Sequence, residues 1–253
     1  TAAYGGTGDF ASWVGQQTSL AADAMVSAVG VSYFTSNMVV LMPGQNNNTA
    51  VLQTCLTAPK WVALGNTAPW QRTVIGGTGQ KTITGVTVAT YLGQYSWPSG
   101  DFTTLQAQTD PATTFFNTLT SYPNSGPTFT NVPTGGWNAA CVQIVTDNVT
   151  LLTSYGNLPI YAYEGGPAFD GSGASGQITF WNTIAVDARW ATYYDSLLQQ
   201  LKAAGLQFQN HYGFAEVNGS GNWGAIQSPY QTQYPVSSSP PKWQALVNFR
   251  SGV

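Results

Sequence analysis

The ten residues LPIYAYEGGP, residues 158–167, indicate the architecture of the whole chain. Their apolar run predicts a buried β-strand that ends on Glu164 and is followed by two glycines. Gly165 and Gly166 carry no side chain and would let a ligand approach the backbone closely. In parallel α/β folds, polar residues at the carboxyl ends of strands line the active site. Glu164 is therefore a candidate nucleophile or general base, and a solvated strand-end glutamate is the alternative.

Helices and strands are expected to alternate on both sides of this segment. Further strands are predicted at 38–42, 82–92 and 206–214, from apolar or β-branched runs. Helices are predicted at 11–28, 49–56, 113–120, 139–155, 180–204 and 241–249, and the rest of 96–138 is expected to be an extended loop. Regular alternation with apolar strands predicts a parallel sheet covered by helices, within a single α/β domain over residues 1–253.

The number of strands narrows the fold class. Only four are expected, whereas a complete eight-stranded barrel takes roughly 250 residues in the same architecture. The prediction is therefore an α/β fold that forms half of a (β/α)₈ TIM-type barrel, with about four βα units, completed by another chain or by an N-terminal segment. An open doubly wound sheet is the alternative that needs no partner. The chain begins at Thr1 rather than Met, as expected if a leader or a longer N-terminal part has been removed.

The composition excludes several classes of protein. Hydrophobic residues make up 43% of the chain and aromatic residues 13%, which is enough for a large core, while only 7% of residues are charged. Seven basic and ten acidic residues without a basic cluster argue against a nucleic-acid partner, and no apolar run is long enough for a membrane span. The scarcity of charge is typical of a secreted or cell-surface protein. Cys55 and Cys141 form either one disulfide or two buried thiols.

The segment Tyr161–Pro167 resembles the seventh strand of secreted (β/α)₈ glycoside hydrolases and hydrolase-like proteins, where a Y-E-G-G motif carries the catalytic nucleophile. The runs VVLMPGQ (39–45), GVTVATYLG (85–93) and HYGF (211–214) resemble the fifth, sixth and eighth strands, and PKWQAL (241–246) resembles the closing helix. The resemblance covers most of the chain. It implies the C-terminal half of such a barrel, proteolytically processed and paired with a second polypeptide.

The resemblance also assigns roles to individual residues. It implies retaining hydrolysis with Glu164 as nucleophile, held by a hydrogen bond from Tyr91. Asn210 and His211 would contact sugar hydroxyls, and Trp223 would stack on a sugar ring. A buried structural tyrosine and a structural histidine are the alternatives. Weaker stacking candidates are Trp97, Trp137 and Trp181.

One departure from the family pattern concerns the acid/base. In these barrels it belongs to an Asn-Glu pair at the end of the fourth strand, and this chain contains no Asn-Glu dipeptide. The acid/base is therefore expected on an N-terminal partner, unless the activity is lost or Glu216, the only other glutamate, replaces it. No zinc motif, phosphate loop or nucleophile elbow occurs, so neither a metal nor another cofactor is expected.

The expected function is therefore a glycoside hydrolase-like protein that acts on or binds an extracellular polysaccharide. A non-catalytic surface or matrix scaffold, or a glycan-binding protein with a degenerate barrel, is the alternative. Its weakly charged surface would associate readily with other surfaces.

Overall fold

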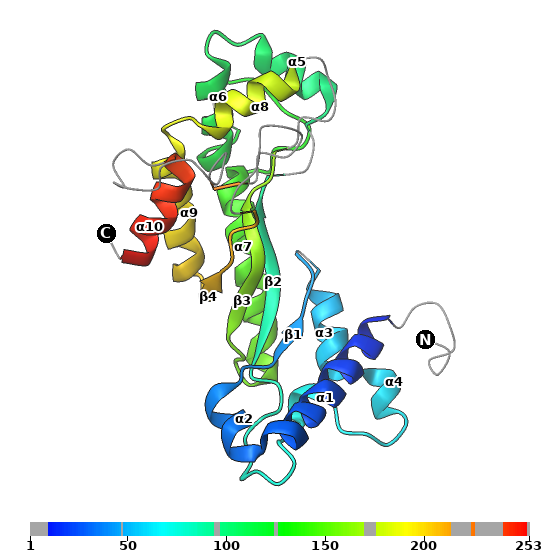
Figure 1. Cartoon of the computed structure of the whole chain (residues 1–253). Helices are drawn as coiled ribbons and strands as arrows, with labels where there is room; N and C mark the ends of the chain where they lie inside the picture. Colours follow the sequence, from blue (N-terminus) through cyan, green and yellow to red (C-terminus); the bar gives the residue numbers. More distant parts are fainter. Residues whose placement is uncertain are drawn as a thin grey trace. The chain divides into compact units, whose positions relative to one another are not determined.

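The structure is a computed structural model that describes residues 10–46, 48–93, 97–123, 126–169, 176–213, 224–225 and 240–251. It is a mixed α/β fold whose described strands form one sheet in the order β1-β2-β3-β4 (Figure 1). The strands are β1 (Leu41–Pro43), β2 (Gly85–Leu92), β3 (Ile160–Pro167) and β4 (Leu206–Gln209). They run parallel, and β1 pairs with β2 in the register that places Leu41 opposite Gly85. The expected α/β class with four parallel strands is confirmed.

The strands end at other residues than the sequence predicts. β1 begins at Leu41 rather than at 38. The backbone N–H of Val40 bonds to the Thr84 hydroxyl at 3.0 Å, and the Val40 carbonyl accepts from the Thr84 backbone N–H at 2.9 Å. β4 ends at Gln209 rather than at 214, and Gly213 then takes a left-handed backbone conformation with φ of 76°. Phe214, the last residue of the predicted strand, lies outside the described residues.

The chain groups into two compact units, each described by itself. The first comprises the described residues of Thr1–Ala89, Thr146–Tyr163 and Gly205–Phe208, and the second those of Thr90–Val145, Glu164–Ala204 and Gln209–Val253. The first unit holds α1 (Phe10–Val29), α2 (Val31–Asn37), α3 (Thr49–Thr57), α4 (Pro59–Val62) and the short 3₁₀ turns η2 (Pro69–Gln71) and η3 (Thr153–Tyr155).

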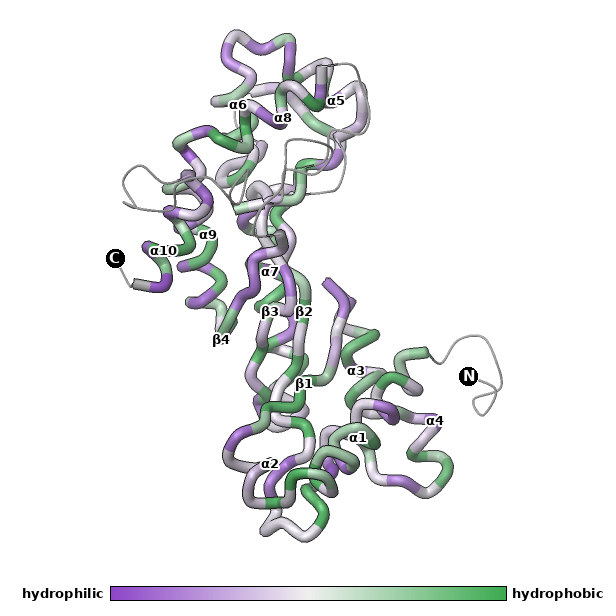
Figure 2. The backbone as a smooth tube through the Cα atoms, in the orientation of Figure 1, coloured by the Kyte–Doolittle hydropathy of each residue, from purple (hydrophilic) through white to green (hydrophobic). Residues whose placement is uncertain are grey.

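Helix α1 packs on α3 through small residues rather than through its large apolar ones. Its buried face includes Ser12, Gly15 and Ser19. A Cβ on Gly15 would overlap the carbonyl oxygen of Cys55 on α3, so the two helices approach backbone to backbone. Leu20 and Met25 belong to the periodic apolar pattern that predicted the helix, yet both are more than two-fifths exposed. Figure 2 shows hydrophobic and hydrophilic residues mixed along α1.

The second unit holds most of the remaining helices. These are α5 (Ser99–Gln106), α6 (Pro111–Thr120), α8 (Gln177–Ala185), α9 (Trp190–Ala203) and α10 (Pro241–Ser251); α7 (Gly136–Leu152) begins here and continues into the first unit. Helix α10 lies beside α9, as Figure 1 shows. Helix α5 occupies part of the stretch that was predicted to be an extended loop. It begins after Pro98, and its Asp101 is buried with hydrogen bonds to Thr130.

The helix predicted over 180–204 is two helices, α8 and α9, and this prediction was wrong. The break lies at Asp187, whose carboxylate accepts hydrogen bonds from the backbone N–H of Arg189 at 2.9 Å and from its guanidinium at 2.6 and 2.8 Å. An aspartate that bonds its own neighbouring backbone competes with the helical ladder. The ion pair with Arg189 also holds the pKa of the Asp187 carboxyl below its usual range.

An aromatic cluster around Phe169 forms the core of the second unit. Phe169 stacks on Trp181 with ring centroids 5.8 Å apart, and it contacts Phe115 edge-on at 4.8 Å. Trp97 and Trp137 join the same cluster, and all three tryptophans are at least 94% buried. Their expected role as sugar-stacking platforms is therefore wrong, because a sugar cannot reach a buried ring. Their indoles belong to the hydrophobic core.

Both cysteines are free and buried. Of the two alternatives that the sequence left open, one disulfide or two buried thiols, the structure shows two thiols. Burial raises the pKa of the Cys55 thiol to about 11 and that of Cys141 to about 12. Neither thiol is therefore a nucleophile at neutral pH, because the reactive form is the thiolate.

Candidate functional site

The candidate residues of the second unit gather at the carboxyl ends of three neighbouring strands. Tyr91 is the next-to-last residue of β2, and Asn210 and His211 directly follow β4. Glu164 lies on β3 between them in the sheet order, three residues before the strand ends at Pro167. The ends of parallel neighbours meet at one edge of a sheet, so the topology brings these residues to the same region. We call it the carboxyl edge.

A chain of three hydrogen bonds crosses the carboxyl edge. The Thr90 hydroxyl donates to Oε1 of Gln209 at 2.9 Å, and Nε2 of Gln209 donates to the Tyr194 hydroxyl at 3.4 Å. The Tyr194 hydroxyl in turn lies 2.7 Å from Nδ1 of His211. Tyr194 comes from α9, so this helix is tied to the strand ends. We call these four residues the relay.

Gly165 and Gly166 make room for the relay on the backbone of β3. A Cβ on Gly165 would overlap the Thr90 hydroxyl and lie 3.0 Å from Nε2 of Gln209. A Cβ on Gly166 would lie only 2.8 Å from Nδ1 of His211. The glycines were interpreted as leaving space for a ligand. That interpretation was wrong, because side chains of the protein itself occupy the space.

Tyrosine rings and the single histidine give this edge its polar and aromatic character. Tyr91 contacts Tyr212 edge-on, with ring centroids 6.0 Å apart, and the backbone N–H of Tyr212 donates to the Gly165 carbonyl at 2.8 Å. Tyr212 is 42% exposed. It was not singled out from the sequence, although it stands in the HYGF run directly after His211. Asn210 is exposed, and Glu164 and His211 are half-buried.

Tyr194 was missed altogether from the sequence. Its side chain is completely buried, and burial raises the pKa of its hydroxyl well above the usual range, against a smaller lowering by the hydrogen bond from Gln209. The residue stands inside a helical run, at a spacing that resembles any core position. Only the fold shows that its hydroxyl reaches His211.

Several expected contacts stay predictions. The hydrogen bond from the Tyr91 hydroxyl to Glu164 is one of them. Trp223 and Glu216 lie outside the described residues, so the structure places neither of them. Within the described part of the chain no group of three or more histidine, cysteine, aspartate or glutamate side chains could hold a metal ion. No helix described in the structure is long and apolar enough to cross a membrane.

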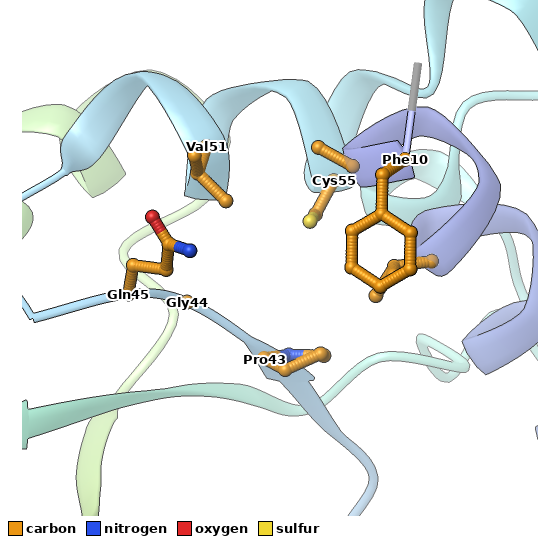
Figure 3. A pocket seen from close by; sticks show the side chains of 8 residues that line it. Phe10, Pro43, Gly44, Gln45, Val51 and Cys55 are labelled. Carbon is orange, nitrogen blue, oxygen red and sulfur yellow. The ribbon is translucent and has the colours of Figure 1, made fainter. Parts of the chain in front are cut away.

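A cavity of about 540 Å³ opens in the first unit (Figure 3). Helices α1 and α3 and the end of β1 line it, with the Gln45 amide and the Cys55 thiol as its polar groups. The other lining residues are Phe10, Ala11, Val14, Pro43, Gly44 and Val51. The lining is mostly apolar, whereas a sugar needs several hydrogen-bonding groups. The carboxyl edge is therefore the better candidate for carbohydrate chemistry.

Comparisons of the chain with protein families, with curated proteins and with solved structures found no match.

Proposed function

We propose that this chain is the C-terminal half of a (β/α)₈-barrel glycoside hydrolase-like protein, exported from the cell, that acts on or binds an extracellular polysaccharide. The observation that carries the proposal is the meeting of Glu164, Tyr91 and His211 at the carboxyl ends of adjacent parallel strands. Active sites of (β/α)₈ enzymes lie at that face. The four strands of the described residues also make up half the number in such a barrel.

In the proposed reaction Glu164 is the nucleophile of a retaining mechanism. Its carboxylate attacks the anomeric carbon while a second carboxylic acid protonates the departing glycosidic oxygen. Water then attacks the same carbon, gives its proton to the second carboxylate and releases Glu164. The two carboxyl groups must lie roughly 5–5.5 Å apart. The lack of an Asn-Glu dipeptide in this chain supports an acid/base supplied by the other half of the barrel.

The remaining edge residues would bind the sugar. Asn210 and His211 offer hydrogen-bonding groups, and the Tyr91 hydroxyl would orient Glu164. Tyr212 adds a partly exposed aromatic face, which suits the apolar face of a sugar ring as Trp223 would. The scarcity of basic residues throughout the chain favours a sugar over an anionic ligand at this edge.

The test uses the natively isolated protein with whatever chain accompanies it. Native and denaturing mass spectrometry identify a second polypeptide, whose sequence is then searched for an Asn-Glu pair. Release of reducing ends from β-linked polysaccharides is measured for the wild type, for Glu164→Gln and for the matched change Glu216→Gln. We expect Glu164→Gln to abolish hydrolysis and Glu216→Gln to leave it unchanged. Full hydrolysis by Glu164→Gln would overturn the mechanism.

A non-catalytic scaffold or glycan-binding protein is the second candidate. The observation that favours it is the 7% of charged residues, because weakly charged surfaces associate readily. In that case the partner chain has no carboxylate facing Glu164, no polysaccharide is hydrolysed, and Glu164→Gln leaves polysaccharide binding in affinity electrophoresis unchanged. These outcomes separate the scaffold from the enzyme.

A further inference from the structure

We infer that Thr90, Gln209 and Tyr194 hold the proton of His211 on Nε2, so that the histidine serves the carboxyl edge as a hydrogen-bond donor of fixed direction. The three residues are positioning residues that act through the imidazole. Only the identity of the accepting group, a sugar oxygen, rests on the proposed function. The placement of the proton follows from the contacts of the relay.

The first step is the orientation of the Gln209 amide. The Thr90 hydroxyl donates to its Oε1 at 2.9 Å, which leaves Nε2 facing the Tyr194 hydroxyl at 3.4 Å. The longer distance favours this orientation over the flipped amide. Hydroxyl-to-oxygen hydrogen bonds cluster near 2.7–2.8 Å, so 3.4 Å is too long for a tyrosine that donates to an amide oxygen. It fits a weak hydrogen bond from nitrogen better.

The second step is the direction of the Tyr194 hydrogen. An amide nitrogen can only donate, so the Tyr194 oxygen accepts from Gln209 and keeps its own hydrogen for another acceptor. That acceptor is Nδ1 of His211, 2.7 Å away, a normal length for a donating hydroxyl. Burial supports the same direction, because it disfavours the phenolate form of Tyr194.

The third step concerns the imidazole itself. A neutral imidazole carries one hydrogen, and a ring nitrogen that accepts a hydrogen bond does not carry it. Nδ1 accepts from Tyr194, so the hydrogen is on Nε2. Gly166 makes this arrangement possible, because a side chain there would displace Nδ1. In this tautomer His211 donates through Nε2 and is not a general base at that atom.

The test exploits the fact that His211 is the only histidine in the chain. Protein labelled with ¹⁵N-histidine gives the signals of one imidazole, and the spectra are recorded at a pH of about 8, above the ordinary pKa of histidine side chains. We expect a pyridine-type shift for Nδ1 and a pyrrole-type shift, with a directly bonded proton, for Nε2. A pyrrole-type Nδ1 would overturn the inference from the wild-type protein alone.

Variants test whether the relay is the cause. Tyr194→Phe removes the donor, and the two ¹⁵N shifts should move toward those of a free imidazole, which exchanges between tautomers. Thr90→Val releases the Gln209 amide and should move them in the same direction by less. The matched control is Tyr193→Phe, the neighbour on α9, whose ring contacts Phe116 instead. Unchanged shifts in both Tyr194→Phe and Thr90→Val would overturn the relay.

The inference and the proposed function fail separately. Absence of polysaccharide binding or hydrolysis would remove the sugar as acceptor without altering the ¹⁵N shifts of the free protein. A proton on Nδ1 of His211 would contradict the inference about the relay, even if hydrolysis depends on Glu164.

Discussion

Gly166→Ala should destabilise the protein through two separate effects at the carboxyl edge. Gly166 has φ of 121°, a backbone conformation that side chains rarely adopt. Residues held in such regions cost about 1–3 kcal/mol. The new Cβ would also lie 2.8 Å from Nδ1 of His211 and 3.2 Å from the Tyr194 hydroxyl, and overpacking of this kind costs about 1–3 kcal/mol. We therefore expect the free energy of unfolding to fall by about 2–6 kcal/mol.

The control that separates the two effects is Gly176→Ala, in the same unit. Gly176 also has a positive φ, 90°, but a Cβ added to it would meet nothing within 4 Å, so only the backbone cost applies. Urea unfolding followed by tryptophan fluorescence and circular dichroism gives both free energies. The reasoning is refuted if Gly166→Ala is no more destabilising than Gly176→Ala. That result would mean that the space beside Gly166 is open, as a ligand site would require.

Three further predictions concern the rest of the chain. Gly15→Ala should lower the free energy of unfolding by about 1–3 kcal/mol, because α1 and α3 approach closely at this residue. Gly100→Ala has open space around the new Cβ and should raise the free energy of unfolding by up to about 1 kcal/mol. Calorimetry measures both changes. Cys55 and Cys141 should resist iodoacetamide at a pH of about 8 until the protein unfolds. The folded pKa values of both thiols exceed the unfolded value of ~8.5. Their contribution to the free energy of unfolding is therefore complete below pH ~8.5 and is lost as the pH rises toward 11 for Cys55 and 12 for Cys141. Urea unfolding at a series of pH values across this range measures that loss. Asp101→Ala should lower the free energy of unfolding in urea by about 1.5–3 kcal/mol, because the backbone N–H groups of Thr130 and Asn131 lose hydrogen bonds to a buried charged acceptor; equal stability would contradict this.

The sequence predicted the order of the main elements because strand and helix patterns are local properties. The strand around Ile160, the helix around Val26 and the closing helix at Pro241 all occur where apolar spacing placed them. The buried face of α1 was not predictable in the same way. Its contact is made by Gly15 and its small neighbours, and small residues leave no mark on a hydrophobic pattern.

The break between α8 and α9 has a similar explanation. Apolar residues continue through it at helical spacing, and neither proline nor glycine marks the interruption. The cause is a single aspartate, Asp187, which bonds the backbone of Arg189 and anchors its guanidinium. Such competition depends on where the arginine is held by its other contacts, including the hydroxyl of Thr113 at 2.9 Å and the face of Phe116. Tertiary contacts of Arg189 thus reinforce the local hydrogen bonds that interrupt the helix.

In the candidate site, too, some residues could be predicted from the sequence and others only from the fold. Glu164 was singled out because it follows an apolar run that is visible in the sequence, whereas Tyr194 was missed because its contact depends on a hydroxyl that reaches across from a helix. The two glycines connect these observations. Between Tyr163 and Pro167, β3 contributes only one side chain, that of Glu164, and the space left free at Gly165 and Gly166 is taken by the relay. A side chain at either glycine would disturb the relay that orients His211. The Y-E-G-G run therefore places one carboxylate beside two positions without side chains, and the relay that orients His211 fills the space at those positions. This holds whichever ligand the carboxyl edge binds.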